Sequence, residues 1–234
     1  NVNRFNKNDD GVDTAFALHI YKSFINKYIN NNHKRDAVLG CILSAHLTEF
    51  DNDKPLTEED VKGTNNVFNV TVGGVLWRVV NQGLTDLIED SNDVLDDNYG
   101  KIKASFEVGF SDYKIVECPA NSRNLSEGRI IEDPEETEKL SANLKVFGGN
   151  GKTVNGTRVY RLLSGDGIGL GSGLTEVPAG FLNPVAVNKD TETESKATTV
   201  AVNIDLNSSG ELVVRQELVK VLTHRLDVRN AIVK

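Results

Sequence analysis

The feature that most constrains the fold of this chain is a stretch of strict alternation at residues 101–110. Apolar side chains occupy every second position, and Lys103, Ser105, Glu107 and Gly109 stand between them. Successive side chains of a β-strand point to opposite faces, so this alternation predicts a strand with one buried face and one polar face. Ser105 and Glu107 are therefore expected on the same polar face.

The rest of the sequence predicts more strands than helices. Residues 12–30 carry aromatic and aliphatic side chains at helical spacing, and residues 79–95 repeat with a period near 3.6. Residues 37–44 form a short apolar run typical of a strand buried on both faces. Further strands are expected at the start of 69–80 and at 113–118, 157–163, 174–187 and 198–206. The pattern predicts an α+β fold: a mostly antiparallel sheet, or a barrel-like core, with a few packed helices.

Composition divides the chain into a domain and an extension. Residues 1–187 are expected to form the domain, with a charged, glycine-containing insertion at 119–155 that holds one helix. The glycine-rich run at 165–173 is interpreted as a flexible loop between two strands. Residues 188–234 begin with a polar linker and form a C-terminal extension, which could dock onto a partner.

Charge and cysteine usage exclude several classes of function. The net charge of −8 argues against nucleic-acid binding, which needs clustered Lys and Arg. No apolar run approaches the roughly 20 residues that span a bilayer, so no membrane association is expected. Cys41 and Cys118 are not part of a Cys/His cluster, and we expect buried, reduced thiols. The sequence predicts no cofactor and no metal site.

Ser105 is the first candidate for chemistry, and a serine hydroxyl needs an adjacent base to become a nucleophile. Four histidines are available. His19 lies in the first predicted helix, His33 in a polar Asn-rich loop, and His224 in the basic tail. His46 directly follows a predicted buried strand, where a rigid scaffold can aim its side chain into a cleft. The sequence therefore favours His46 as the base.

Three motifs in order give the chain a resemblance to a known family. They are the segments 43–46 (LSAH), 105–110 (SFEVGF) and 174–180 (LTEVPAG). In this order they resemble the prohead (capsid maturation) proteases of tailed phages, in which a strand precedes the catalytic His and a serine strand comes later. His46 and Ser105 are 59 residues apart, a spacing similar to that of the family. The resemblance covers residues 37–187.

The resemblance implies roles for three residues. Ser105 would be the nucleophile, His46 the general base, and Glu176 the acid that orients His46 and stabilises its imidazolium. Two alternative acids remain open. Glu107 is expected to face the same way as Ser105, and Glu117 precedes a Pro-Ala pair that resembles the family's third motif.

The resemblance also implies a function and a setting. The expected activity is that of a serine endopeptidase that cleaves scaffold and capsid proteins, and itself, during phage head maturation. Its partners would be phage capsid, scaffold or portal proteins, met as a homo-oligomer or in a large assembly. It would act in the host cytoplasm, inside the procapsid, with retention in the virion as a further option. The alternative is a non-enzymatic virion protein that keeps the protease fold at the portal vertex or inner capsid.

Overall fold

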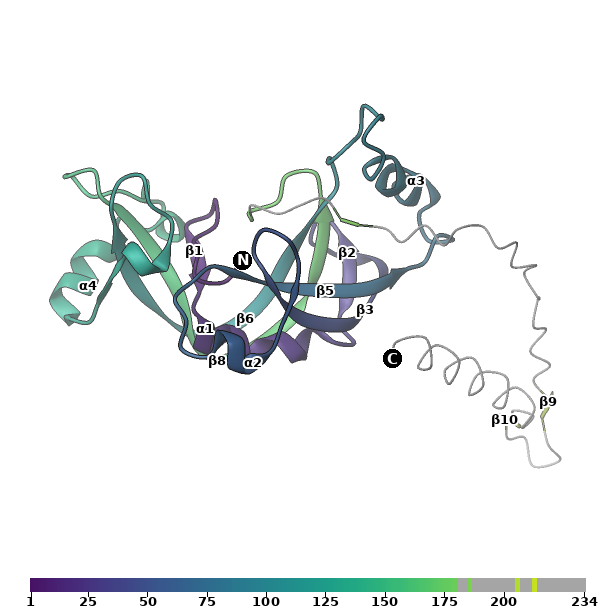
Figure 1. The fold of residues 1–234 in the computed structure, drawn as a ribbon, viewed down its shortest axis with the longest axis horizontal. Coiled ribbons are helices and arrows are strands. Elements are labelled where there is room, and N and C mark those ends of the chain that lie inside the picture. Colours follow the sequence, from purple (N-terminus) through teal and green to yellow (C-terminus); the bar gives the residue numbers. More distant parts are fainter. Residues whose placement is uncertain (181–184, 187–204, 207–211, 214–234) are drawn as a thin grey trace. The chain divides into compact units, whose positions relative to one another are not determined.

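The structure, a computed structural model, describes residues 1–180, 185–186, 205–206 and 212–213 (Figure 1). The chain divides into two compact units, Asn1–Val187 and Asn188–Lys234. The first unit has a mixed α/β fold, with a large sheet and a few short helices. In the second unit, β9 (Asp205–Leu206) pairs antiparallel with β10 (Leu212–Val213).

One sheet organises the first unit. Its strands are β1 (Asp10–Val12), β2 (Tyr28–Asn31), β3 (Lys34–Glu49), β4 (Pro55–Leu56), β5 (Phe68–Leu76), β6 (Lys103–Cys118), β7 (Arg129–Ile131) and β8 (Arg158–Thr175). The order is β4-β3-β2-β8-β6-β7, with β5 paired to β3 and β1 to β8. Strands β1 and β2 run parallel to β8, and the other pairs are antiparallel.

The helical elements are short. They are α1 (Thr14–Ile20), α2 (Glu58–Val61), α3 (Gln82–Asp90) and α4 (Pro134–Ser141), with 3-10 turns η1 (Tyr21–Phe24), η2 (Leu125–Glu127) and η3 (Lys145–Phe147). Within the described part of the chain, no helix has the length and apolar character that crossing a membrane requires.

The helix predicted over residues 12–30 is shorter than its periodicity suggests. It begins at Asp13, whose side chain accepts a hydrogen bond from the N–H of Phe16, as an N-cap does. It stops after η1 because Ile25 is extended and Asn26 has a positive φ of 67°. The N–H of Asn26 then donates to the carbonyl of Ile42 at 2.8 Å, which leads the chain into the sheet as β2.

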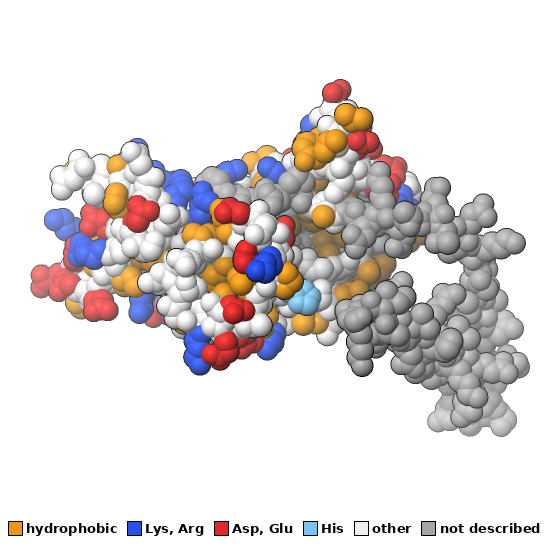
Figure 2. Space-filling view, viewed as in Figure 1, with side chains coloured by type: hydrophobic (Ala, Val, Ile, Leu, Met, Phe, Trp, Pro, Cys, Tyr) orange, Lys and Arg blue, Asp and Glu red, His pale blue; other side chains and the backbone are white. Residues whose placement is uncertain are grey.

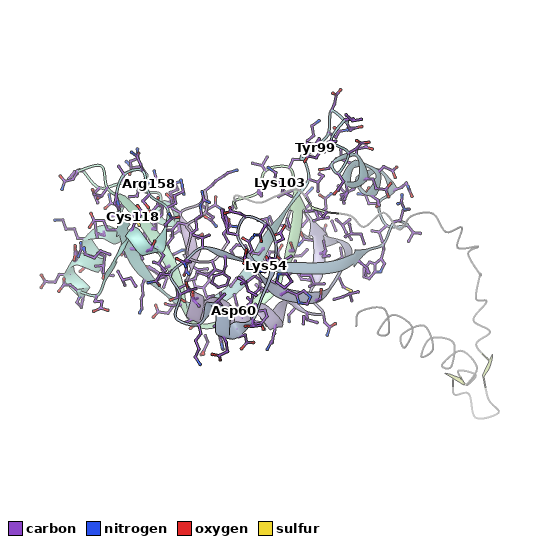
Figure 3. All side chains as sticks on the ribbon, viewed as in Figure 1. Lys54, Asp60, Tyr99, Lys103, Cys118 and Arg158 are labelled. Atoms are coloured by element: carbon purple, nitrogen blue, oxygen red, sulfur yellow. The ribbon has the colours of Figure 1, made fainter. Side chains whose placement is uncertain are left out.

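Two strands are longer than predicted. The strands predicted at 101–110 and 113–118 are one continuous strand, β6, with a register shift between Phe110 and Asp112. The glycine-rich run expected to be a flexible loop lies inside β8, a single strand of 18 residues. Figure 3 labels Lys103 and Cys118, which mark the two ends of β6.

The glycines of β8 are needed for close packing. A Cβ on Gly169 would lie 2.7 Å from the ring of Phe24, and a Cβ on Gly171 would lie 2.8 Å from the ring of Tyr28. Aromatic side chains of the N-terminal segment therefore rest directly on the β8 backbone. Glycine in a strand often marks such a close approach, and here it creates the space for it.

The predicted insertion extends the far end of the β6–β8 pair with its own small core. Buried residues from β6, β7, α4 and β8 form it: Ile115, Ile131, Leu140, Leu144 and Val159. The N-terminal segment is joined to this end by the stacked rings of Phe5 and Tyr160, whose centroids are 4.3 Å apart. The insertion is thus packed into the first unit.

A buried carboxylate holds the same region together. Asp9 is only 1% exposed, and it forms ion pairs with Arg123 at 3.1 Å, Arg158 at 3.0 Å and Lys145 at 3.1 Å. A carboxylate this deep needs partners to offset its lost hydration. The cluster is therefore best understood as structural.

The two thiols differ in environment. Cys118 is buried, and burial raises the pKa of its thiol to about 11, while Cys41 is half-buried. We expect a thiol-specific reagent at pH 8 to modify Cys41 readily and Cys118 only after unfolding, because the thiolate is the reactive form. Peptide mapping after timed labelling checks this. Equal rates at both cysteines in the folded protein would contradict it.

Candidate functional site

Ser105 lies near the start of β6, where β6 pairs with β8. It is 7% exposed, and its cross-strand partner on β8 is Gly173. Its carbonyl accepts a hydrogen bond from the Ser172 hydroxyl at 3.3 Å. The Ser105 hydroxyl itself bonds to none of the residues that the structure describes. The strand predicted over residues 101–110 is confirmed from Lys103 on as part of β6, and Ser105 and Glu107 share a face. The predicted burial of the two faces is wrong at this point, because Ser105 is buried whereas Phe106 is exposed.

His46 does not reach this position. It is an exposed residue of β3, paired with Thr71 of β5. The row of cross-strand partners through Ser105 continues to Gly173, Asn30 and then Val38 of β3. Val38 precedes His46 by eight residues, or roughly 26 Å of regular strand. Among the described residues, the expected His46–Ser105 hydrogen bond is not formed.

Glu176 follows the last residue of β8 and is exposed. Within the described ranges it forms no hydrogen bond or ion pair, so it does not orient His46 in this structure.

Glu117 lies at the opposite end of β6, roughly 40 Å along the strand from Ser105. It accepts hydrogen bonds from Thr157 at 2.6 Å and Arg129 at 2.8 Å, which hold the pKa of its carboxyl below the usual value. These partners place Glu117 in the packing of the insertion.

Glu107, the remaining acid, is the centre of a polar cluster. Its Oε1 accepts from Asn30 Nδ2 at 2.7 Å and lies 2.8 Å from His33 Nδ1. Its Oε2 accepts from the Tyr28 hydroxyl at 2.8 Å. Burial acts to raise the pKa of Glu107, but hydrogen bonds from Asn30, His33 and Tyr28 outweigh it, so the pKa lies below its usual value. Because the carboxylate is ionised, His33 Nδ1 carries the proton of their shared hydrogen bond.

His33 occupies an unusual place for a histidine. It and Asn32 form the two-residue turn between β2 and β3, with φ of 60° and 51°. Positive φ at both central residues is the geometry of a type I′ turn, whose second position favours glycine. His33 adopts this less favourable φ while its side chain contacts Glu107.

The same turn brings His33 next to Ser105. A Cβ on Gly173 would lie 2.9 Å from His33 Nδ1 and 3.1 Å from Asn30 Oδ1. Gly173 is directly opposite Ser105, and paired residues of antiparallel strands carry their Cβ atoms on one face, about 5 Å apart. The imidazole therefore lies one cross-strand spacing from the serine side chain. We call Ser105, Glu107, His33, Asn30 and Tyr28 the Ser105 cluster.

Sequence reasoning identified two of the five residues of this cluster. Ser105 and Glu107 were accessible through alternation, but His33 was assigned to a polar loop. The available signal was the Asn-rich run before a predicted strand, because Asn is among the few residues that tolerate positive φ. A tight hairpin there would have carried His33 back onto the sheet.

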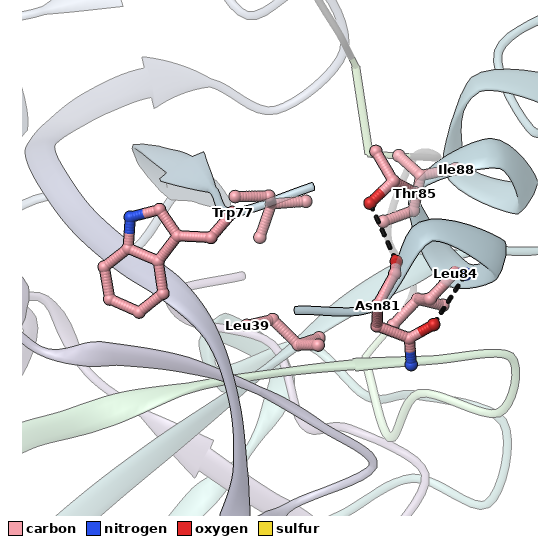
Figure 4. Close-up of a pocket in the computed structure, with 7 residues that line it drawn as sticks. Leu39, Trp77, Asn81, Leu84, Thr85 and Ile88 are labelled. Atoms are coloured by element: carbon pink, nitrogen blue, oxygen red, sulfur yellow. Dashed lines mark hydrogen bonds between the residues drawn. The ribbon is translucent and has the colours of Figure 1, made fainter. Parts of the chain in front are cut away.

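A separate pocket lies between the end of β5 and α3 (Figure 4). It is lined by Leu39, Leu76, Trp77, Asn81, Leu84, Thr85 and Ile88. Its polar groups serve the helix start: Asn81 Oδ1 accepts from the N–H of Leu84, and the Thr85 hydroxyl donates to the Asn81 carbonyl. The lining contains no titratable side chain. Figure 2 shows apolar and acidic side chains together over the nearby α3 segment.

Comparisons with known proteins give no relative. No family model, no curated protein and no solved structure matches the chain. Among the residues that can be described, no group of three or more His, Cys, Asp or Glu side chains could hold a metal ion.

Proposed function

We propose that this chain is a serine endopeptidase, with Ser105 as nucleophile, His33 as general base and Glu107 as the acid that orients it. The observation that carries the proposal is the 2.8 Å contact between Glu107 and His33 Nδ1, beside a serine on the same face of the sheet. An acid, an imidazole and a hydroxyl in this order are the parts of a serine-protease triad, which is recognised by geometry rather than by sequence position.

In the proposed reaction, His33 accepts a proton and gives it back in each half of the cycle. His33 Nε2 removes the hydroxyl proton as Ser105 Oγ attacks the scissile carbonyl, and Glu107 stabilises the imidazolium through Nδ1–H. The imidazolium then protonates the leaving amine as the C–N bond breaks. In the second half, His33 removes a proton from a water that attacks the acyl carbon. The ester bond to Ser105 Oγ then breaks, and the His33 imidazolium returns the proton to that oxygen.

The substrate class rests on the resemblance of the three sequence motifs to prohead proteases. By that resemblance the chain cleaves scaffold and capsid proteins, and itself, inside an assembling phage procapsid. His46 and Glu176 are the base and acid that the resemblance implies. They remain the competing assignment, which the following experiment separates from His33 and Glu107.

A fluorophosphonate probe tests the proposal without a known substrate. An activated serine displaces fluoride and becomes phosphonylated, and mass spectrometry locates the modified residue. We expect Ser105 to be labelled in the wild-type chain and in His46→Ala, and labelling to fall strongly in His33→Ala. The control Ser105→Ala should take up no probe. Labelling lost in His46→Ala but kept in His33→Ala would reverse the assignment of the base.

One observation favours a second function. The Ser105 hydroxyl is not hydrogen-bonded to His33 among the described residues, and Ser105 is nearly buried. A virion structural protein that keeps the protease fold, at the portal vertex or inner capsid, would show this arrangement. A wild-type chain that resists the probe yet is present in mature particles would select this alternative.

A further inference from the structure

We infer that Asn30 is a positioning residue, which holds the Glu107 carboxylate aimed at His33. This inference rests on the proposed function for its catalytic meaning, but its physical content is a property of the Ser105 cluster. Asn30 is fully buried on β2, and the β2–β3 register shifts on both sides of it. Such irregularities re-aim side chains, and here the amide is directed across β8 toward β6.

The orientation of the Asn30 amide is determined by its neighbour. Nδ2 lies 2.7 Å from Glu107 Oε1, and a reversed amide would place two oxygens in contact. With Nδ2 toward the carboxylate, Asn30 Oδ1 is a buried acceptor without a hydrogen-bond partner among the described residues. Nearly all buried acceptors are satisfied, and an unsatisfied one is destabilising. Packing alone does not explain a buried asparagine whose side-chain oxygen lacks a hydrogen bond.

The unpaired oxygen also points toward the reacting side of the cluster. It lies 3.1 Å from the Cβ position of Gly173, which is opposite Ser105. One amide thus contacts the acid through nitrogen and presents an acceptor near the nucleophile through oxygen.

Asn30 and Tyr28 hold the Glu107 carboxylate from both oxygens, which leaves Oε1 aligned with His33. The imidazole itself is at an exposed turn, with 43% of its side chain accessible, so its orientation depends on this fixed acceptor. The titratable and charged groups facing Glu107 are Tyr28 from β2, His33 from the turn and, through Tyr28, Arg35 of β3. Removing the Asn30 donor should act first on the protonation of Glu107.

Two substitutions at Asn30 test the inference in the full chain. Asn30→Asp is isosteric and places a second carboxylate against Glu107, so the Glu107 pKa should rise strongly. Asn30→Ala removes one donor without adding charge. It should raise the midpoint of the Glu107 titration by about one pH unit, which is a tenfold change in the acid dissociation constant. Carbon-13 NMR of the glutamate side chains, assigned with Glu107→Gln, measures both shifts. The second variant decides if the first does not fold.

Asn31→Asp is the matched control, because it makes the same change of charge one residue further along β2, on the opposite face of the strand. It should leave the Glu107 titration where it is in the wild type. Nitrogen-15 NMR of His33 adds a readout that simple packing would not move. The Nδ1–H tautomer should predominate in the wild type and lose that predominance in Asn30→Ala.

The outcomes separate this inference from the proposed function. A raised Glu107 titration with no probe labelling of wild-type Ser105 would keep the positioning role and remove the protease activity. Labelling of wild-type Ser105 with an unchanged Glu107 titration in both Asn30 variants would overturn the positioning role alone.

Discussion

Replacing His33 with glycine is expected to remove the activity of Ser105 and leave the fold intact. A general base contributes about 10²- to 10⁴-fold to the rate, so labelling or cleavage should fall by about 10³-fold. The effect arises because His33 supplies the imidazole that Glu107 orients beside Ser105. A second histidine on that face is absent from the described residues, since His46 lies on another part of β3.

The stability of this variant distinguishes a functional residue from a structural one. Glycine relieves the positive φ of 60°, a gain of about 1 kcal/mol, because non-glycine residues are strained in this region. The lost hydrogen bond to Glu107 is destabilising by about 1 kcal/mol. The free energy of unfolding should therefore stay within about 1 kcal/mol of the wild-type value.

Urea unfolding measures the stability, and the rate of probe labelling at Ser105 measures the activity. His46→Gly serves as the control for losing an imidazole from an exposed position on the sheet. If the His33 variant were labelled at the wild-type rate, His33 could not be the base. If it unfolded at much lower urea, the turn histidine would have a structural role.

The local sequence pattern was sufficient to predict those features that a single strand or helix determines by itself. The alternation of residues 101–110 predicted β6 and the shared face of Ser105 and Glu107, because side-chain direction in a strand is a local property. The start of α2 is equally local, because the Thr57 hydroxyl and the Asp60 carboxylate form a reciprocal cap within four residues.

Long-range packing decided what local pattern could not. The glycines of β8 were interpreted as a loop because they are needed for close packing against Phe24 and Tyr28. These two residues lie about 140 residues earlier in the chain. His33 read as a loop residue because its partner Glu107 is 74 positions away and is reached only after β2 and β6 have both paired with β8. A candidate site formed by three strands is therefore the part of the molecule least visible in the sequence.

Gly40→Ala is expected to be the most destabilising small substitution in the sheet. A Cβ at Gly40 would collide with the carbonyl oxygen of Val75 and lie 2.8 Å and 2.9 Å from Val75 C and Leu76 Cα. These are backbone atoms of β5, which pairs with β3 at this position, so they cannot move without breaking the pairing. Overpacking of this kind costs about 3 kcal/mol or more.

Gly83→Ala is the matched control, because the same methyl group would meet no atom within 4 Å in the first turn of α3. Alanine is the better helix former, so this variant should gain up to about 1 kcal/mol. Chemical unfolding of both variants beside the wild type measures the two effects. Because Gly40 also faces Ile29 on β2, next to Asn30, its loss of stability should be accompanied by a change in the Glu107 titration. A Gly40→Ala protein with wild-type stability would show that β5 does not pair with β3 at this register.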